Sequence, residues 1–196
     1  MTRENVIDII KQNNGILLVS VAEENGISRA YLSKLVKEGH IERAERGSYI
    51  LSDSIHDDMY ALQNRISGCV FSHETALFFH ELTDRTPNKY SFTIPERHRL
   101  SEKTRDENKV YYIKPELSEL GVITMPTSFG NMVRVYDAER TICDMIRSRN
   151  RCDIQMLTDA LKKYVNRKNA DFNKLNAYAK QLRVSKILSQ YMEVML

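Results

Sequence analysis

Cationic and hydroxyl-bearing side chains gather in residues 28–37, a segment whose apolar residues recur at helical spacing. Leu32, Leu35 and Val36 fall on one face of such a helix and predict its buried side. The side chains predicted to contact DNA from this segment are Ser28, Arg29, Tyr31, Ser33, Lys34 and Lys37. An arginine early in a helix can form two hydrogen bonds with a guanine, and lysines further along suit phosphates. The chemistry that this face predicts is recognition of double-stranded DNA.

The residues around this helix predict the elements that position it. Asn25-Gly26 supplies a left-handed turn, and Ser28 is expected to cap the helix that follows. A shorter helix, with Ser20 as its expected N-cap, precedes the turn, and Gly39 ends the second helix. This order is that of a helix-turn-helix, in which the outer face of the second helix is free to enter a major groove.

Residues 41–51, IERAERGSYIL, are expected to form a hairpin that turns at Arg46-Gly47. The side chains of this hairpin predicted to contact DNA are Arg43, Arg46 and Tyr49. We therefore interpret residues 1–52 as a winged helix-turn-helix DNA-binding domain. The alternative is a small helical module whose polar face serves protein contacts.

The distribution of charge suggests that a second surface assists this domain. Residues 1–52 contain seven Lys/Arg and seven Asp/Glu, so they are formally neutral, whereas residues 140–196 contain twelve Lys/Arg and five Asp/Glu. Because non-specific attraction to DNA comes from neutralised phosphates, the basic segment is a candidate for further phosphate contacts. The candidate residues, two of them in a loop after a predicted strand, are Arg97, Arg99, Lys162, Lys163, Arg167 and Lys168. The alternative is that the basic helices serve solubility alone.

The composition of the 196 residues is typical of a globular protein, with 42% hydrophobic and 28% charged residues. No apolar run approaches the roughly 20 residues of a membrane span, and the N-terminal segment predicts an amphipathic helix, not a signal peptide. Cys69, Cys143 and Cys152 are odd in number and widely spaced, which favours reduced thiols in a cytoplasmic protein over disulfides or a zinc site. No cofactor is expected.

Residues 53–196 are expected to form a second domain. Alternating apolar residues predict strands at 69–71, 89–94, 110–113, 122–125 and 132–136. Helical patterns cover 56–66, 73–82, 137–147 and two or three further segments from 153 to the end. The predicted fold class is α+β: a winged helix-turn-helix followed by a mixed α/β domain with a small sheet and a helical C-terminal half.

Two stretches of the second domain carry a family resemblance: SHETALFFHELTDRTPNKYSFTIPERHRL at 72–100 and VYDAERTICDMI at 135–146. Together with the N-terminal winged helix they resemble the AbiEi antitoxin family over nearly the whole chain. The most specific parts are Ser72–Leu77, Pro95, Glu139–Thr141 and Asp144.

Members of that family are transcriptional regulators encoded beside nucleotidyltransferase-like toxins in abortive-infection, type IV toxin–antitoxin systems. The resemblance implies a repressor that binds inverted repeats in its own promoter. Because a single module covers only about half a turn of groove, two molecules are expected to read such repeats, either as a preformed dimer or by self-association on the DNA. It also implies an antitoxin role for the second domain, without a stable complex with the toxin.

Other functions have weaker support in the sequence. His73 and His80 lie two helical turns apart, but no spacing specifies a third ligand, so no metal site is expected. Arg140 and Asp144, at i and i+4, are expected to pair and fix a helix on the sheet, not to form an active site. A metal-dependent nuclease would need an acidic constellation drawn from Glu74, Asp84, Glu96 and Asp137. No enzymatic activity is expected; an adaptor that neutralises a partner directly is the leading alternative.

Overall fold

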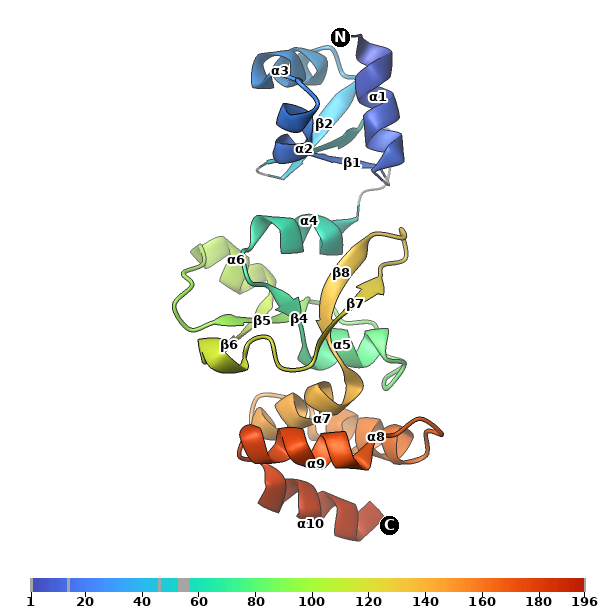
Figure 1. Ribbon diagram of the computed structural model, residues 1–196, viewed down its shortest axis with the longest axis vertical. Coiled ribbons are helices and arrows are strands. Elements are labelled where there is room, and N and C mark those ends of the chain that lie inside the picture. Colours follow the sequence, from blue (N-terminus) through green and yellow to red (C-terminus); the bar gives the residue numbers. More distant parts are fainter. Residues whose placement is uncertain (1, 14, 46, 53–56, 196) are drawn as a thin grey trace. The chain divides into compact units, whose positions relative to one another are not determined.

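The computed structural model describes residues 2–13, 15–45, 47–52 and 57–195 (Figure 1). The chain divides into two compact units, one of residues 1–67 with 126–133 and one of residues 68–125 with 134–196. The boundary expected at residue 52 stays a prediction.

The N-terminal segment of the first unit consists of short helices and strands. Its elements are α1 (Arg3–Gln12), β1 (Ile16–Leu18), α2 (Val19–Glu24), α3 (Arg29–Lys37), β2 (Ile41–Glu45), β3 (Ser48–Leu51) and α4 (Asp58–Arg65). Among the described residues, β3 pairs antiparallel with both β1 and β2, which gives the sheet order β1-β3-β2. The order helix, turn, helix and hairpin therefore follows the sequence pattern.

Apolar faces of these helices and of the sheet form one core in the first unit. Leu32 and Leu35 of α3 are buried, and Val36 packs against the same cluster, as the helical spacing predicts. Ala22 and Ile27 are also buried. The small Ala22 side chain allows α2 and α3 to lie close together, and Ile27 anchors the connecting turn in the core.

The start of α2 differs from the expectation. The helix begins at Val19 with Leu18 as its N-cap, and Ser20 lies inside the helix instead of capping it. β1 leads directly into α2, and the Val19 amide donates to the Gly47 carbonyl at 2.9 Å. The hairpin turn thus satisfies the first of the helix amides that have no partner within the helix.

A second sheet has the strand order β6-β5-β4-β8-β7 within the described chain. Its strands are β4 (Val70–Phe71), β5 (Ser91–Pro95), β6 (Lys109–Ile113), β7 (Val122–Pro126) and β8 (Met132–Tyr136). β4 pairs antiparallel with β5 and parallel with β8, and β5 pairs parallel with β6. Each expected strand is thus present, and its ends differ from the expectation by at most two residues.

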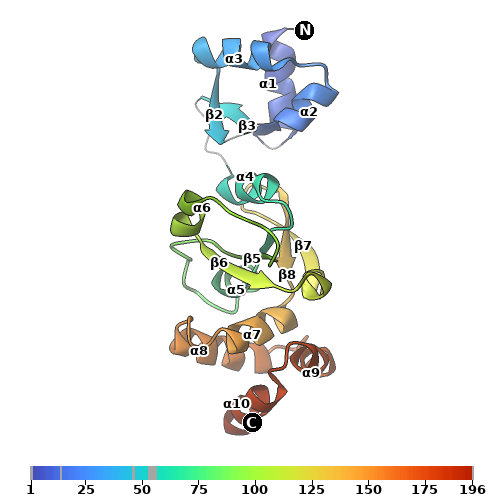
Figure 2. The same ribbon diagram turned by 90° about the vertical axis from the view of Figure 1, so that its left-hand side faces the viewer.

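Helices make up the rest of the second unit. They are α5 (His73–Phe79), α6 (Glu102–Glu107), the 3₁₀ turn η1 (Pro115–Leu117), α7 (Ala138–Arg147), α8 (Ile154–Val165), α9 (Phe172–Gln181) and α10 (Ser185–Met195). Figure 2 shows α7 to α10 gathered together, and α7 packs against α5, α8 and α9. Residues 139–146 of α7 are all buried, so α7 is the central helix of this layer.

The observed architecture confirms a mixed α/β protein with helices and two small sheets. Among the described residues, no helix is both long enough and apolar enough to cross a membrane.

Candidate nucleic-acid interface

The turn that leads into α3 fixes the orientation of this helix. Gly26 has a φ of +72°, the left-handed conformation that the sequence predicts at this position. The Ser28 hydroxyl accepts a hydrogen bond from the Tyr31 amide at 3.2 Å and so caps α3, as expected. With Ile27 buried directly before the cap, the first turn of α3 is anchored on both sides.

The outer face of α3 is exposed. Arg29, Ser33, Lys34 and Lys37 are exposed, as is the capping residue Ser28. Tyr31 is half-buried and packs against the core of the first unit. The cations on α3 are therefore accessible to a ligand, which is the first requirement for contacts to bases and phosphates.

Two of these cations form exposed ion pairs. Arg29 Nε lies 2.8 Å from Glu23 Oε1, although the two side chains are 73% and 51% exposed. Lys34 Nζ lies 3.8 Å from Glu38 Oε1. Lys37 has no ion-pair partner among the described residues. Exposed pairs contribute about 0–1 kcal/mol, so DNA phosphates can replace the carboxylates at little cost.

The expectation that Tyr49 decorates the hairpin surface is wrong. Tyr49 is only 3% exposed and belongs to the core of the first unit. β3 is the central strand of its sheet. Ile50, the residue after Tyr49, belongs to a second apolar cluster, distinct from the one that contains Tyr49. Both faces of β3 are therefore covered, which leaves Tyr49 no route to a DNA contact.

Tyr49 instead contacts the side chain of Arg43 through both its ring and its hydroxyl. The exposed Arg43 places its guanidinium carbon 5.7 Å from the centre of the Tyr49 ring, and Arg43 Nη2 donates to Tyr49 Oη at 3.4 Å. Arg43 is thereby held at the surface of the hairpin. The third predicted hairpin residue, Arg46, lies outside the described residues.

The residues predicted as secondary phosphate contacts all belong to the second unit. Arg97 and Arg99 are exposed in the loop after β5. Lys162 and Lys168 are exposed near the end of α8, and Arg167 is half-buried. Lys163 forms an ion pair with Asp84 at 2.7 Å, so one of these cations is already partly neutralised.

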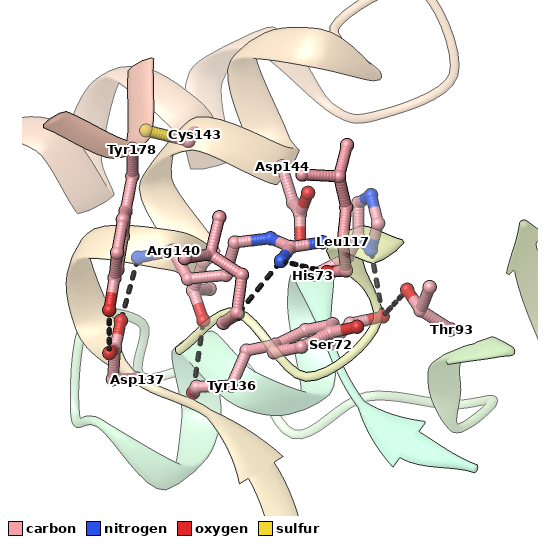
Figure 3. Close-up of polar contacts among 12 residues, drawn as sticks. Ser72, His73, Thr93, Leu117, Tyr136, Asp137, Arg140, Cys143, Asp144 and Tyr178 are labelled. Carbon is pink, nitrogen blue, oxygen red and sulfur yellow. Dashed lines mark hydrogen bonds and ion pairs between the residues drawn. The ribbon is translucent and has the colours of Figure 1, made fainter. Parts of the chain in front are cut away.

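The motif residues of the second unit form a buried polar network around Arg140 (Figure 3). Arg140 is fully buried, and its Nε donates to Asp144 Oδ2 at 3.0 Å. Its Nη1 donates to the carbonyls of Leu117 and Leu120 at 2.9 and 2.8 Å. The guanidinium also lies over the Tyr136 ring, 4.1 Å from its centre. Arg140 therefore joins α7 to the loop before β7 and to β8.

Asp137 and Glu139 join the same helix to α9. Asp137 caps α7 by accepting a hydrogen bond from the Arg140 amide at 2.8 Å. Lys174 Nζ lies 2.9 Å from Asp137 Oδ2 and 3.2 Å from Glu139 Oε2. Tyr178 Oη donates to Asp137 Oδ2 at 3.2 Å. No local pattern predicts the two partners on α9, because they lie more than 30 residues further along the chain.

His73 and His80 have separate partners. His73 is stacked on Tyr111 with ring centres 3.4 Å apart, whereas His80 Nε2 is 2.7 Å from the Tyr136 carbonyl oxygen. Burial, with Arg140 and further nearby cations, lowers the pKa of His73 well below its usual value. In the described part of the chain, no group of three or more His, Cys, Asp or Glu side chains is placed to hold a metal ion.

The acidic residues considered for a nuclease are spread over the second unit. Glu74 is buried and accepts from Ser91 Oγ at 2.6 Å, and Lys109 Nζ lies 2.8 Å from its other carboxylate oxygen. Asp84 is exposed beside Lys163, and Asp137 caps α7. Each of these three carboxylates has a structural partner.

Residues 5–52 match the family of AbiEi antitoxin transcriptional regulators. This match confirms the family resemblance for that segment; for the second domain the resemblance stays a prediction. No curated protein matches the chain. Among solved structures, the RV2827C protein from Mycobacterium tuberculosis is similar in fold, with a TM-score of 0.53 and 10% identity. The similarity covers 97% of this chain and 79% of that protein. The family match supports a role as an antitoxin-type transcriptional regulator.

Proposed function

We propose that this protein is a DNA-binding transcriptional autorepressor and the antitoxin of a type IV toxin–antitoxin operon that provides phage resistance by abortive infection. The observation that carries the proposal is the accessible cationic face of α3, capped and oriented by the turn at Gly26, within the segment that matches the antitoxin regulators. On this interpretation α1 to β3 form a winged helix-turn-helix.

In the proposed complex, α3 enters the major groove. Arg29 and Ser33 lie early and midway along α3 and read base edges, while Lys34 and Lys37 contact phosphates. Arg43, held by Tyr49, contacts a flanking phosphate from the hairpin. One such module covers about half a turn of groove, so inverted repeats in the promoter engage two molecules. Repression follows from occlusion of the promoter.

The test is a gel-shift titration with the DNA upstream of the gene, at 50 and 200 mM KCl. Affinity that depends on phosphate contacts falls strongly between these two salt concentrations. The protein should give a specific shift that weakens at the higher salt. The variant Arg29→Ala/Lys34→Ala/Lys37→Ala should lose it. The matched control is Arg3→Ala/Lys11→Ala, which removes two exposed cations from α1 and should retain the shift.

Absence of a shift on every upstream fragment, or an equal loss in the α1 control, would contradict the proposal. The same α3 variant also tests whether DNA binding and the antitoxin role belong to different parts of the chain. When co-expressed with the neighbouring toxin, it should still protect cells, because the proposal assigns the antitoxin role to residues 53–196.

A further inference from the structure

A pocket of about 330 Å³ lies in the second unit. Its walls come from the start of α5, from β5 and β6, and from the C-terminal end of α7 with the turn that follows this helix. The lining side chains that matter for its chemistry are His73, Thr93, Tyr111, Arg147, Ser148 and Arg151. A volume of this size falls at the lower end of the range for small-molecule sites.

Two arginines give the pocket a positive charge. Arg147 and Arg151 both line it and are exposed, and neither forms an ion pair with a described carboxylate. Arg151 Nη2 donates to the Val110 carbonyl at 3.3 Å, and its guanidinium carbon lies 4.6 Å from the centre of the Tyr111 ring. These contacts position the guanidinium group and leave its Nε and Nη1 atoms for a ligand. Arginine suits phosphate because its planar set of donors can pair with two oxygens at once.

The acidic side chain that lines the pocket does not offset this charge. Asp144 Oδ2 lies 3.0 Å from Arg140 Nε, so the charge of this carboxylate is already balanced within α7. The effect of the cations is visible at His73, whose pKa is lowered first by burial and then by four nearby cations, Arg147 and Arg151 among them. An anionic ligand would therefore meet two guanidinium groups and no unbalanced carboxylate.

A buried row of hydrogen bonds ends at the pocket with a donor. Thr93 Oγ1 donates to Ser72 Oγ at 2.8 Å, and Ser72 Oγ lies 2.9 Å from His73 Nδ1 (Figure 3). Ser72 is fully buried, and Nδ1 is the acceptor described for its hydroxyl proton. The neutral ring then carries its own proton on Nε2 and donates it to Ser148 Oγ, 3.0 Å away. The hydroxyl proton of Ser148 is thus left for a ligand.

The groups that form this wall are held in place by the fold. His73 has a φ of +49°, a left-handed backbone that non-glycine residues rarely adopt, and its ring is stacked on Tyr111 with ring centres 3.4 Å apart. The Arg151 amide donates to the Ser148 carbonyl at 2.7 Å, which closes the turn after α7 and brings both residues to the pocket. Because these donors are fixed before a ligand arrives, little conformational entropy is lost when it binds.

We propose that this pocket binds the phosphate group of a phosphate monoester. Arg147 and Arg151 pair with the phosphate oxygens, and the Ser148 hydroxyl donates a further hydrogen bond to them. Because both arginines are exposed, the esterified group extends toward solvent. The site shares no residue with the surfaces proposed to contact DNA, so the two proposals can fail separately.

The test is isothermal titration of the full chain with glycerol 3-phosphate, and with glycerol as the same ligand without its phosphate. Glycerol 3-phosphate should bind and glycerol should not. Arg147→Gln should weaken binding about tenfold or more, since it removes a charge-assisted hydrogen bond. Ser148→Ala should weaken it about threefold or more without a change in net charge. Arg149→Gln is the matched control: Arg149 is a neighbouring cation that does not line the pocket, and binding should stay within twofold.

A second titration distinguishes two sources of the phosphate group, a small phosphorylated molecule and the 5′ end of a nucleic acid. It uses one short single-stranded DNA with a 5′-phosphate or with a 5′-hydroxyl. If the 5′-phosphorylated strand binds more tightly than glycerol 3-phosphate, and Arg147→Gln weakens this binding, the ligand is a nucleic-acid end. If glycerol 3-phosphate binds at least as tightly, the ligand is a small phosphate ester.

Three results would overturn the proposal: no binding of either phosphorylated probe, equal binding by Arg147→Gln and the unmodified chain, or equal binding of the 5′-hydroxyl and 5′-phosphate strands with no binding of glycerol 3-phosphate. In the last case the groups recognised would be the internal phosphates of the strand. A thermal unfolding scan of each variant verifies that it is folded.

Discussion

At the residue scale, the ion pair between Arg29 and Glu23 involves the first cation of the face of α3 that is proposed to contact DNA. The pair joins α2 to the first turn of α3 at 2.8 Å, and both side chains are largely exposed. In the absence of DNA, Glu23 keeps Arg29 in one orientation. In the proposed complex, the same carboxylate would lie close to the phosphates and repel them.

Glu23→Gln is therefore expected to tighten operator binding, by about two- to fivefold, since an exposed pair contributes at most about 1 kcal/mol. Fluorescence anisotropy with a labelled operator at fixed salt measures this change. Glu24→Gln on the same helix makes the same change of charge without touching Arg29 and should have a smaller effect. Equal gains in both variants would show that net charge, not release of Arg29, is responsible.

The buried His73 makes the free energy of unfolding depend on pH. Burial and nearby cations lower its pKa in the folded state, while in the unfolded chain the pKa is about 6.5. Above that pH the ring is neutral in both states. Below it the unfolded chain binds a proton that the folded chain does not, so the free energy of unfolding falls by up to about 1.4 kcal/mol per pH unit. The lowered pKa of His80 acts in the same direction, again through burial.

His73→Asn should remove one proton from this dependence, because asparagine tolerates the left-handed backbone and does not titrate. Urea unfolding at pH 7, 6 and 5 should show a shallower loss of stability for this variant than for the unmodified chain. Identical slopes would mean that His73 is protonated equally in the folded and unfolded states.

At the scale of elements, the loop before β7 depends on close contact with α7. Gly121 has a φ of +77°, and its carbonyl accepts from the Asp137 amide at 2.7 Å. A Cβ atom at this position would lie 2.8 Å from Arg140 Cβ and 3.1 Å from Asp137 Oδ2. Gly130 also has a positive φ, of +83°, but a Cβ there would meet no atom within 4 Å.

Alanine substitutions at these two glycines distinguish the cost of backbone strain from the cost of a steric clash. Gly130→Ala should reduce the free energy of unfolding by about 1–2 kcal/mol, the cost of a left-handed alanine. Gly121→Ala should reduce it by a further ~1–3 kcal/mol, because the extra methyl must push α7 away. Urea unfolding monitored by circular dichroism measures both. Equal losses in the two variants would contradict the close packing of this loop on Arg140.

The elements were largely predictable from sequence, and the reasons differ between them. The buried face of α3 follows from a local period, and the caps Ser28 and Asp137 from residue type at a helix start. Tyr49 could not be placed, since β3 is covered on both faces and alternation carries no information there.

The interior of the second unit was less predictable. The Arg140–Asp144 pair was visible as an i,i+4 spacing, but its complete burial depends on carbonyls of Leu117 and Leu120 that lie about 20 residues earlier. The stacking of His73 on Tyr111 likewise joins residues far apart in sequence. Such contacts are set by how the chain crosses the sheet, which no local pattern encodes.

At the scale of the whole molecule, the two surfaces proposed to contact DNA lie in segments of different net charge. Residues 1–52 are formally neutral, so the described cations of α3 and β2 can supply few phosphate contacts by themselves. Each phosphate contact contributes about 0.9 to the slope of log affinity against log salt concentration. The slope therefore reports how many cations of the whole chain take part.

We expect Lys162→Glu/Lys163→Glu/Arg167→Glu/Lys168→Glu to weaken operator binding and to flatten the salt dependence by up to about 3.6. Anisotropy titrations between 50 and 200 mM KCl measure this slope. A control with the same change in net charge reverses four exposed cations that lie outside the predicted surface and before the C-terminal helices: Lys89, Lys103, Arg105 and Lys114. If binding and slope are unchanged in the first variant, or change equally in both, the C-terminal helices make no specific phosphate contacts. The first unit would then have to obtain its affinity from base contacts of α3 and from pairing of two molecules on the repeats, and its slope alone should account for the total.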